Sequence, residues 1–169
     1  PGGGRNHVSA RFYRHFNVIG CTQMQHESMD LIFATIFHNF LAKFTLASED
    51  LQGLCEPLVA ASIDVYTTML RDMRPTPAKS HYQFNLRDLS NVFQGICMVS
   101  PRARLNVGQV IRLWQHECTR VFSDRLVNET DNQNWVDILT NRTKSTFKEY
   151  DAEVKEASVI KKKVVDKES

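Results

Sequence analysis

The stretch "ESMDLIFATIFHNFLAKF" (Glu27–Phe44) repeats apolar residues at steps of three and four. This spacing brings the apolar side chains to one face of an α-helix, because the helix completes a turn every 3.6 residues. The members of this stripe are Met29, Ile32, Phe33, Ile36, Phe37, Phe40, Leu41 and Phe44. The stretch therefore predicts a long amphipathic helix with a broad face to bury, which favours a helical fold.

A second helix is predicted from about Cys55 to Met73. Pro57 suits its first turn, where the missing backbone N–H would have no intrahelical partner in any case. The two prolines of the following stretch, "RPTPAKSHYQF" (74–84), cannot continue a helix and predict a loop.

Further helices are predicted on the carboxyl-terminal side of this loop. One begins after Phe84, where Asn85 is a good N-cap and Asp88 stands three residues later, as in a capping box. Another is predicted over Val107–Val127, and a short helical turn over Trp135–Leu139. Helices with apolar stripes and short connections pack as a bundle, so a helical bundle is the predicted architecture.

One short β-strand, "HFNVIGC" (His15–Cys21), is predicted ahead of the helices. A single strand leaves its edges unpaired, so it would have to join a sheet supplied by other sequence. The chain begins at Pro1, without an initiator methionine, and we expect it to be an excised segment. The predicted fold is thus mainly α, a helical bundle (26–139) preceded by the end of an incomplete αβ subdomain (1–25) and followed by a charged tail (140–169).

Composition and charge argue against several classes of function. A net charge of +2 is too small to indicate a nucleic-acid-binding or membrane-binding surface, and no long uncharged apolar run predicts a membrane span. The histidines form no HxxxH or HExxH pair, and the cysteines form no CxxC pair, so no metal site is predicted. The widely spaced cysteines are expected to be buried thiols rather than a disulfide scaffold: Cys21, Cys55, Cys97 and Cys118.

The glycine-rich opening, Pro1–Gly4, raises the question of a phosphate-binding loop. Such a loop needs the pattern GxxxxGK[ST], in which a lysine reaches the phosphates and a hydroxyl binds magnesium. Here Gly4 is followed by Arg5 and Asn6, and no lysine occurs before Lys43. The opening is therefore interpreted as a tight turn that uses the conformational freedom of glycine.

Three arginines are better candidates for contacts with phosphate. Arg11 and Arg14, in "SARFYRHF", are three residues apart in a predicted helical turn and so share a face. Arg87, in "FNLRDL", stands in the first turn of a predicted helix beside Asp88. A guanidinium binds phosphate oxygens with two parallel hydrogen bonds. Each arginine considered alone is also a candidate for an ordinary salt bridge.

Three stretches together resemble the dynein heavy chains: "PGGGRNHVSARFYRHFNVI" (1–19), "TPAKSHYQFNLRDLSNVFQGI" (76–96) and "VIRLWQHECTRVFSDRL" (110–126). The resemblance covers about residues 1–135 and points to the end of the third AAA+ module of the motor ring. The glycine-rich opening is more similar to the axonemal branch than to the cytoplasmic one. The resemblance implies that the helical bundle is an AAA+ lid and that the strand belongs to the αβ large subdomain.

The resemblance also implies roles for the arginines. Arg11 matches the arginine finger that approaches nucleotide in the preceding module, with Arg14 as the second candidate. Arg87 matches the sensor II arginine, which reaches from the lid towards the phosphates of its own module. ATP or ADP with magnesium is expected only in the full motor, because the chain has neither a Walker A lysine nor a Walker B acidic pair.

The implied partners are the neighbouring AAA+ modules and, through the parent motor, microtubules and the dynein light and intermediate chains. The implied location is cytoskeletal, in a ciliary or flagellar axoneme. An independent helical protein–protein interaction module is the alternative from a different class of function. A DNA-binding helical domain is a weaker third option, because the sequence shows no basic stripe.

Overall fold

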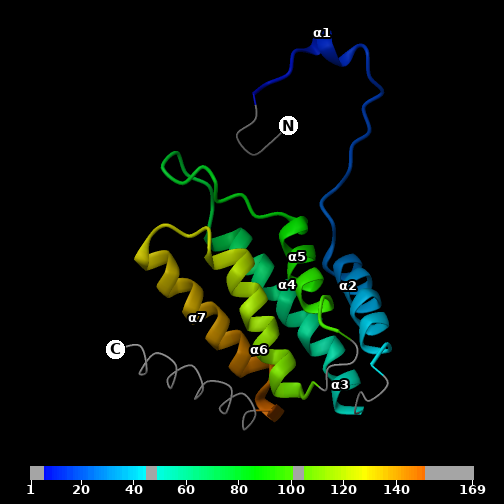
Figure 1. Ribbon diagram of the computed structural model, residues 1–169. Helices are drawn as coiled ribbons and strands as arrows, with labels where there is room; N and C mark the ends of the chain where they lie inside the picture. The colour runs from blue at the N-terminus through cyan, green and yellow to red at the C-terminus, as the bar shows by residue number, and fades with distance from the viewer. Residues whose placement is uncertain (1–5, 45–48, 101–104, 151–169) are drawn as a thin grey trace.

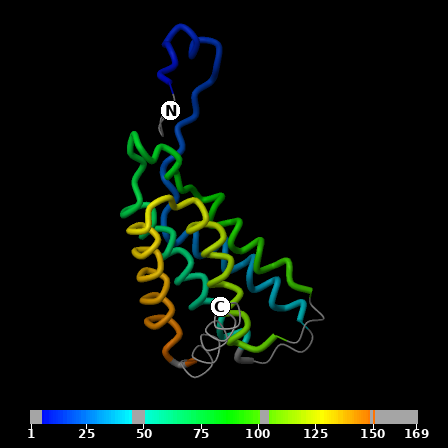
Figure 2. The backbone as a smooth tube through the Cα atoms, turned by 60° about the vertical axis from the view of Figure 1, so that its left-hand side comes forward, coloured from blue at the N-terminus to red at the C-terminus, as the bar shows by residue number. Residues whose placement is uncertain are grey.

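The computed structural model describes residues 6–44, 49–100 and 105–150, and these ranges contain helices and no β-strand. In chain order the elements are α1 Ala10–Tyr13, α2 His26–Leu41, α3 Glu49–Gly53, α4 Cys55–Asp72, α5 Leu86–Cys97, α6 Val107–Cys118, the π-helical η1 Thr119–Ser123, α7 Glu129–Thr146 and the 3₁₀-helical η2 Lys148–Tyr150. The long helices lie side by side as a bundle, while α1 sits on an arm that extends beyond one end of it (Figure 1). The same arrangement is visible in the turned view of Figure 2.

Helix α2 confirms the amphipathic pattern, with one refinement to its buried face. Its buried side chains are Met29, Phe33, Phe37, Phe40 and Leu41. The rings of Phe33 and Phe93 stack with centroids 4.7 Å apart, which joins α2 to α5. Ile32 and Ile36 share the apolar stripe in the sequence but lie at its margin and are exposed.

Helices α4 and α6 meet through the fully buried Trp114 at the centre of the core. Its indole N–H donates to Ser62 Oγ over 2.8 Å, and Ser62 Oγ donates in turn to the carbonyl of Leu58 over 2.7 Å. The only polar atom of the tryptophan side chain is thereby satisfied inside the core. The Trp114 ring also packs against the ring of Phe147. Phe147 directly follows α7, so the end of α7 is packed on the same tryptophan.

Two capping boxes fix the starts of α5 and α6. At α5 the predicted box is confirmed: Asn85 accepts from the helix backbone, and the Asp88 carboxylate accepts from the Asn85 N–H. At α6 the same motif is built by Asn106 and Gln109, a capping box that was not predicted. These side chains satisfy backbone N–H groups that a helix start leaves without partners.

Gly95 permits the close approach of α5 and α6. A Cβ atom at this position would lie 2.0 Å from Oε2 of Glu117, a carboxylate on α6 that is paired with Arg120. Glycine is unfavourable within a helix, so its presence here is explained by the side chain that lies against it.

Three predictions about the elements require correction. The strand predicted at His15–Cys21 is not formed, because a strand needs a partner strand and the described residues supply none. The helix predicted over Val107–Val127 changes to a π-helix at Thr119 and ends at Ser123. The short turn predicted at Trp135–Leu139 is part of an 18-residue helix, α7, which also crosses residue 140, the expected start of the tail.

Helix α7 is long although few of its residues are apolar. Within it only Trp135 and Thr143 are buried, and its mean hydropathy is low, so it gives a weak periodic signal. Its position is set by contacts made across the fold: Thr143 accepts from Gln115 of α6, and Arg142 pairs with Asp64 of α4. The glycine-rich turn at Pro1–Gly4 and the tail beyond Tyr150 lie outside the described residues.

Candidate functional site

Arg87 is the second residue of α5 and is exposed to solvent. Its backbone N–H donates to the Asn85 side chain over 2.9 Å, which fixes the backbone from which the guanidinium extends. The helix start adds a partial positive charge to that of the side chain. This arrangement is suited to an anion that approaches the end of the bundle.

The salt-bridge interpretation of Arg87 is wrong for the described part of the chain. The adjacent Asp88 is buried, and both of its carboxylate oxygens have other partners: Oδ1 accepts from Arg125 over 2.7 Å and Oδ2 from the Asn85 N–H over 2.8 Å. Among the described residues the Arg87 guanidinium has no ion-pair or hydrogen-bond partner. It is therefore available to a ligand.

The loop that precedes α5 is anchored to the start of α7. Asp131 accepts a hydrogen bond from the hydroxyl of Tyr82 over 2.9 Å and pairs with Lys79. The same Tyr82 hydroxyl accepts from the backbone N–H of Val127 over 3.0 Å. Tyr82 is buried, so its hydroxyl needs these partners, and together they tie three segments at one end of the bundle.

The hydrogen bond from Lys79, supported by that from Tyr82, lowers the pKa of Asp131. A lowered folded-state pKa contributes stability above the pKa of an unfolded aspartate, about 3.9, and this contribution is lost as the pH falls through the folded-state value. The carboxylate is only 14% exposed, so solvent screens these contacts weakly. The link between the loop and α7 is therefore present at neutral pH and weakens in acid.

Asp131→Asn is expected to lower the free energy of unfolding by about 1–2 kcal/mol at pH 7, because it removes a charge-assisted contact from a buried hydroxyl and a lysine. Urea denaturation of both proteins between pH 7 and pH 3 measures this effect. The difference should shrink below about pH 4, as protonation removes the charge from wild-type Asp131. The control is Asp137→Asn, an exposed position on the same helix, which should change stability by less than about 0.5 kcal/mol. A constant difference across this pH range would contradict the role of the charge.

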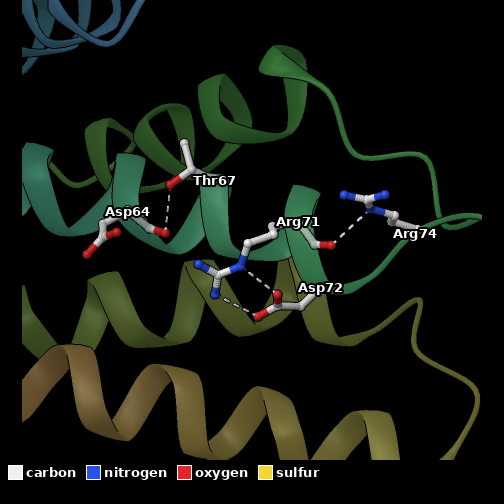
Figure 3. Close-up of polar contacts among 5 residues, drawn as sticks. All are labelled: Asp64, Thr67, Arg71, Asp72 and Arg74. Carbon is white, nitrogen blue, oxygen red and sulfur yellow. Dashed lines mark hydrogen bonds and ion pairs between the residues drawn. The ribbon is translucent and has the colours of Figure 1, made fainter.

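The end of α4 brings two more arginines to the loop. Arg71 and Asp72 form a bidentate pair with distances of 2.7 and 3.0 Å, and Arg74 Nε donates to the carbonyl of Arg71 over 3.2 Å (Figure 3). The bond from Arg71 lowers the pKa of Asp72. Earlier in the helix, the Thr67 hydroxyl donates to the carbonyl of Asp64, as Figure 3 also shows. The charge of Arg71 is balanced locally, whereas Arg87 has no such partner.

A hollow of about 450 Å³ lies beside the start of α5. It is formed where the arm reaches α2 and both face α4, and Leu86, the residue before Arg87, forms part of its wall. Its lining residues are Gln23, Met24, His26, Met29, Tyr66, Thr67, Leu70 and Leu86. Apolar walls with a few polar groups fit an aromatic or apolar portion of a small molecule, and the neighbouring arginine fits an attached anionic group.

Arg11 and Arg14 are not brought together with Arg87. Arg11 lies within α1 and Arg14 directly follows it, as the predicted helical turn requires, and both side chains are exposed. Figure 1 shows α1 on the arm, away from the bundle. Neither guanidinium has a partner among the described residues, so both are free to act on a group outside this chain.

The histidines and cysteines of the described residues build no second chemical site. No cluster of three potential metal ligands occurs in the described ranges, and no described helix is both long and apolar enough to cross a membrane. Cys55 and Cys118 are buried thiols, as predicted, and burial raises the pKa of both, whereas Cys21 is exposed. Cys97 is partly buried.

The sequence indicated Arg87 as a candidate but not the residues that hold its backbone in place. Arg125 is 37 positions from Asp88, and Asp131 is 49 positions from Tyr82. The local signal at Asp131 was a polar stretch between helices, which also fits a solvated loop. The capping box at Asn85 was the one supporting feature that short-range spacing revealed.

Comparison with known proteins gave a family match and several relatives. The model of the AAA+ lid domain matches residues 58–157. The chain is 46% identical over 151 residues to dynein axonemal heavy chain 1 of Homo sapiens and 43% identical over 147 residues to dynein axonemal heavy chain 6 of Homo sapiens. It is 41% identical over 150 residues to dynein axonemal heavy chain 12 of Rattus norvegicus. These alignments include 84%, 87% and 88% of the chain but only 4%, 4% and 5% of the relatives.

Proposed function

The chain belongs to the AAA+ lid domain family, and we propose that it forms the lid of a nucleotide-binding module in the motor ring of an axonemal dynein heavy chain. The identity of 41–46% to axonemal heavy chains supports this assignment. By the resemblance of its motifs, we place it at the end of the third module.

The observation that carries the proposal is the free guanidinium of Arg87 at a capped helix start. In this proposal Arg87 is the sensor II residue and binds the phosphates of nucleotide held by its own module. Its position beside an apolar hollow supports that role, since the base and the phosphates of a nucleotide need neighbouring apolar and cationic surfaces. The positive charge stabilises the negative charge that develops on phosphate oxygens during transfer.

The arm preceding α2 would belong to the large subdomain. Its exposed apolar side chains support this, because such a segment is expected to be covered by a partner surface. They are Phe12, Phe16, Val18 and Ile19. In that setting Arg11, or Arg14 as the second candidate, would act as the arginine finger on the preceding module.

The activity of the whole protein follows from the same proposal. The parent would hydrolyse ATP with magnesium and move along microtubules in a ciliary or flagellar axoneme, together with light and intermediate chains. The chain itself contains no GxxxxGK[ST] motif, so its role is to complete nucleotide sites built with the rest of the ring.

An independent helical interaction module remains the second candidate, and one observation favours it. Leu31, Ile32 and Ile36 form an exposed apolar face on α2, with Leu31 71% exposed. An interaction module would bind a partner through this face without any dependence on nucleotide, which separates the two candidates experimentally.

Arg87→Ala tests the proposal in a motor ring that contains this segment and in which the Walker A lysines of the other modules are replaced. The variant is expected to weaken ADP binding at the remaining site by about 10- to 100-fold, because a charge-assisted contact contributes about 1.5–3 kcal/mol. Equilibrium titration with fluorescent ADP measures the affinity.

Arg71→Ala is the control for Arg87→Ala. It removes an exposed arginine whose charge is balanced by Asp72, and it should leave ADP affinity within about twofold of the wild type. Arg87→Lys should restore only part of the affinity, because lysine lacks the planar fork. Equal ADP affinities for the wild type and Arg87→Ala would contradict the sensor II assignment and favour the interaction module.

A further inference from the structure

We propose that Arg125 is a positioning residue for Arg87: it neutralises Asp88 and so keeps Arg87 free to bind phosphate. This inference rests on the proposed function, because it assigns a task to Arg125 at the same nucleotide site. Arg125 lies between η1 and α7, far from Arg87 in the sequence.

A short series of hydrogen bonds connects the two arginines. Arg125 Nη2 donates to Asp88 Oδ1 over 2.7 Å, and Asp88 Oδ2 accepts from the backbone N–H of Asn85 over 2.8 Å. The Asn85 side chain then accepts from the backbone N–H of Arg87 over 2.9 Å. Each step fixes the next group, so Arg125 helps to set the backbone that carries the Arg87 side chain.

Arg125 is itself held in a defined place. Its guanidinium lies over the ring of Phe84 with 5.0 Å between Cζ and the ring centroid, and its Nη1 donates to the Gln83 carbonyl over 3.4 Å. Its own carbonyl contacts the His81 ring over 3.1 Å. The side chain is therefore positioned by the loop before α5 as well as by Asp88.

The charge of Asp88 explains how Arg125 affects phosphate binding. The carboxylate is only 9% exposed, and among the described residues Arg125 is the one cation that forms an ion pair with it. Without Arg125, the uncompensated carboxylate would attract the neighbouring Arg87 and draw its guanidinium away from phosphate. Pairing with Arg125 removes this attraction.

The test measures ADP and adenosine affinity in the motor ring with one active nucleotide site described above. Arg125→Gln is expected to weaken ADP binding by about 3- to 10-fold, the usual range for coupling through such a network, and to change adenosine affinity by less than about twofold. Adding Asp88→Asn should bring ADP affinity back to within about twofold of the wild type. This second change removes the negative charge but keeps an oxygen that accepts from the Asn85 N–H.

Two further variants separate positioning from general stability. In an Arg87→Ala background, Arg125→Gln should cause no additional loss of ADP affinity, because it acts through Arg87. Arg142→Gln breaks the ion pair between α7 and α4 and should leave ADP affinity unchanged while it lowers the unfolding temperature. The unfolding temperature of every variant is measured in parallel.

The following results would overturn the inference. The first is an equal loss of ADP and adenosine affinity in Arg125→Gln, and the second is an additional loss in the Arg87→Ala background. The third is no recovery when Asp88→Asn is added to a folded Arg125→Gln protein. If Arg87→Ala alone leaves ADP affinity unchanged, the proposed function fails and the role of Arg125 fails with it. If only Arg87→Ala weakens binding, the proposed function stands and the role of Arg125 is refuted.

Discussion

Trp114→Ala is expected to lower the free energy of unfolding by about 3–5 kcal/mol, the usual cost of removing a large aromatic side chain from a core. Trp114 is 0% exposed and contacts two distant parts of the chain, Ser62 on α4 and Phe147 after α7. Single domains are stable by about 5–15 kcal/mol, so this loss is a large share of the total. Urea denaturation followed by circular dichroism measures it.

Two controls identify the source of that loss. Trp114→Phe keeps most of the apolar contact but loses the N–H donor, and we expect it to cost about 1–2 kcal/mol, because Ser62 retains its bond to Leu58. Met98→Ala removes a side chain that is 81% exposed and should change stability by less than about 0.5 kcal/mol. A loss below about 1 kcal/mol for Trp114→Ala would show that the core does not depend on this residue.

The helices with strong local signals were predictable from the sequence. The stripe of α2 and the capping box of α5 each depend on residues at most a few turns apart, and α4 was placed within one residue of its observed bounds at Cys55–Asp72. Local spacing is sufficient in these cases because the helix buries the same face along its whole length.

Helix α7 and the arm show where such reasoning fails. Helix α7 is held by Trp135 and by partners on α4 and α6, so its stability comes from tertiary contacts rather than from its own pattern. The arm has the composition of a strand, but its backbone has no neighbouring strand in the described part of the chain. A strand is defined by its pairing, which no local pattern supplies.

The candidate site likewise has a part that local sequence predicts and a part that only tertiary contacts determine. Arg87 was identified from a short motif, and its N-cap was visible two residues earlier. The pairing of Asp88 with Arg125 joins two segments at the same end of the bundle, and in our proposal it keeps Arg87 free, yet no spacing in the sequence indicates it. Short-range patterns identified the candidate side chain, and the fold shows that its acidic neighbour, Asp88, is paired elsewhere.

Arg11→Ala is expected to lower ATP turnover at the preceding module by about 10³-fold or more, the usual effect of removing an arginine finger. The proposal that α1 faces that module gives the reason: the exposed guanidinium would meet charge that develops on the transferred phosphoryl group. Turnover should be measured in a ring in which only the preceding module retains its Walker A lysine. Arg11→Lys should recover little, since lysine cannot form the same pair of parallel bonds.

Arg14→Ala and Arg87→Ala are the controls in that ring. Arg14 shares the arm and the exposure of Arg11, so a large effect of Arg14→Ala with a small effect of Arg11→Ala would transfer the role to the second candidate. Arg87→Ala should leave the preceding site unchanged, because α5 belongs to the lid of its own module. If Arg11→Ala disturbed only the site beneath this lid, the two arginines would act on one nucleotide and the assignment of Arg11 across the module boundary would be wrong.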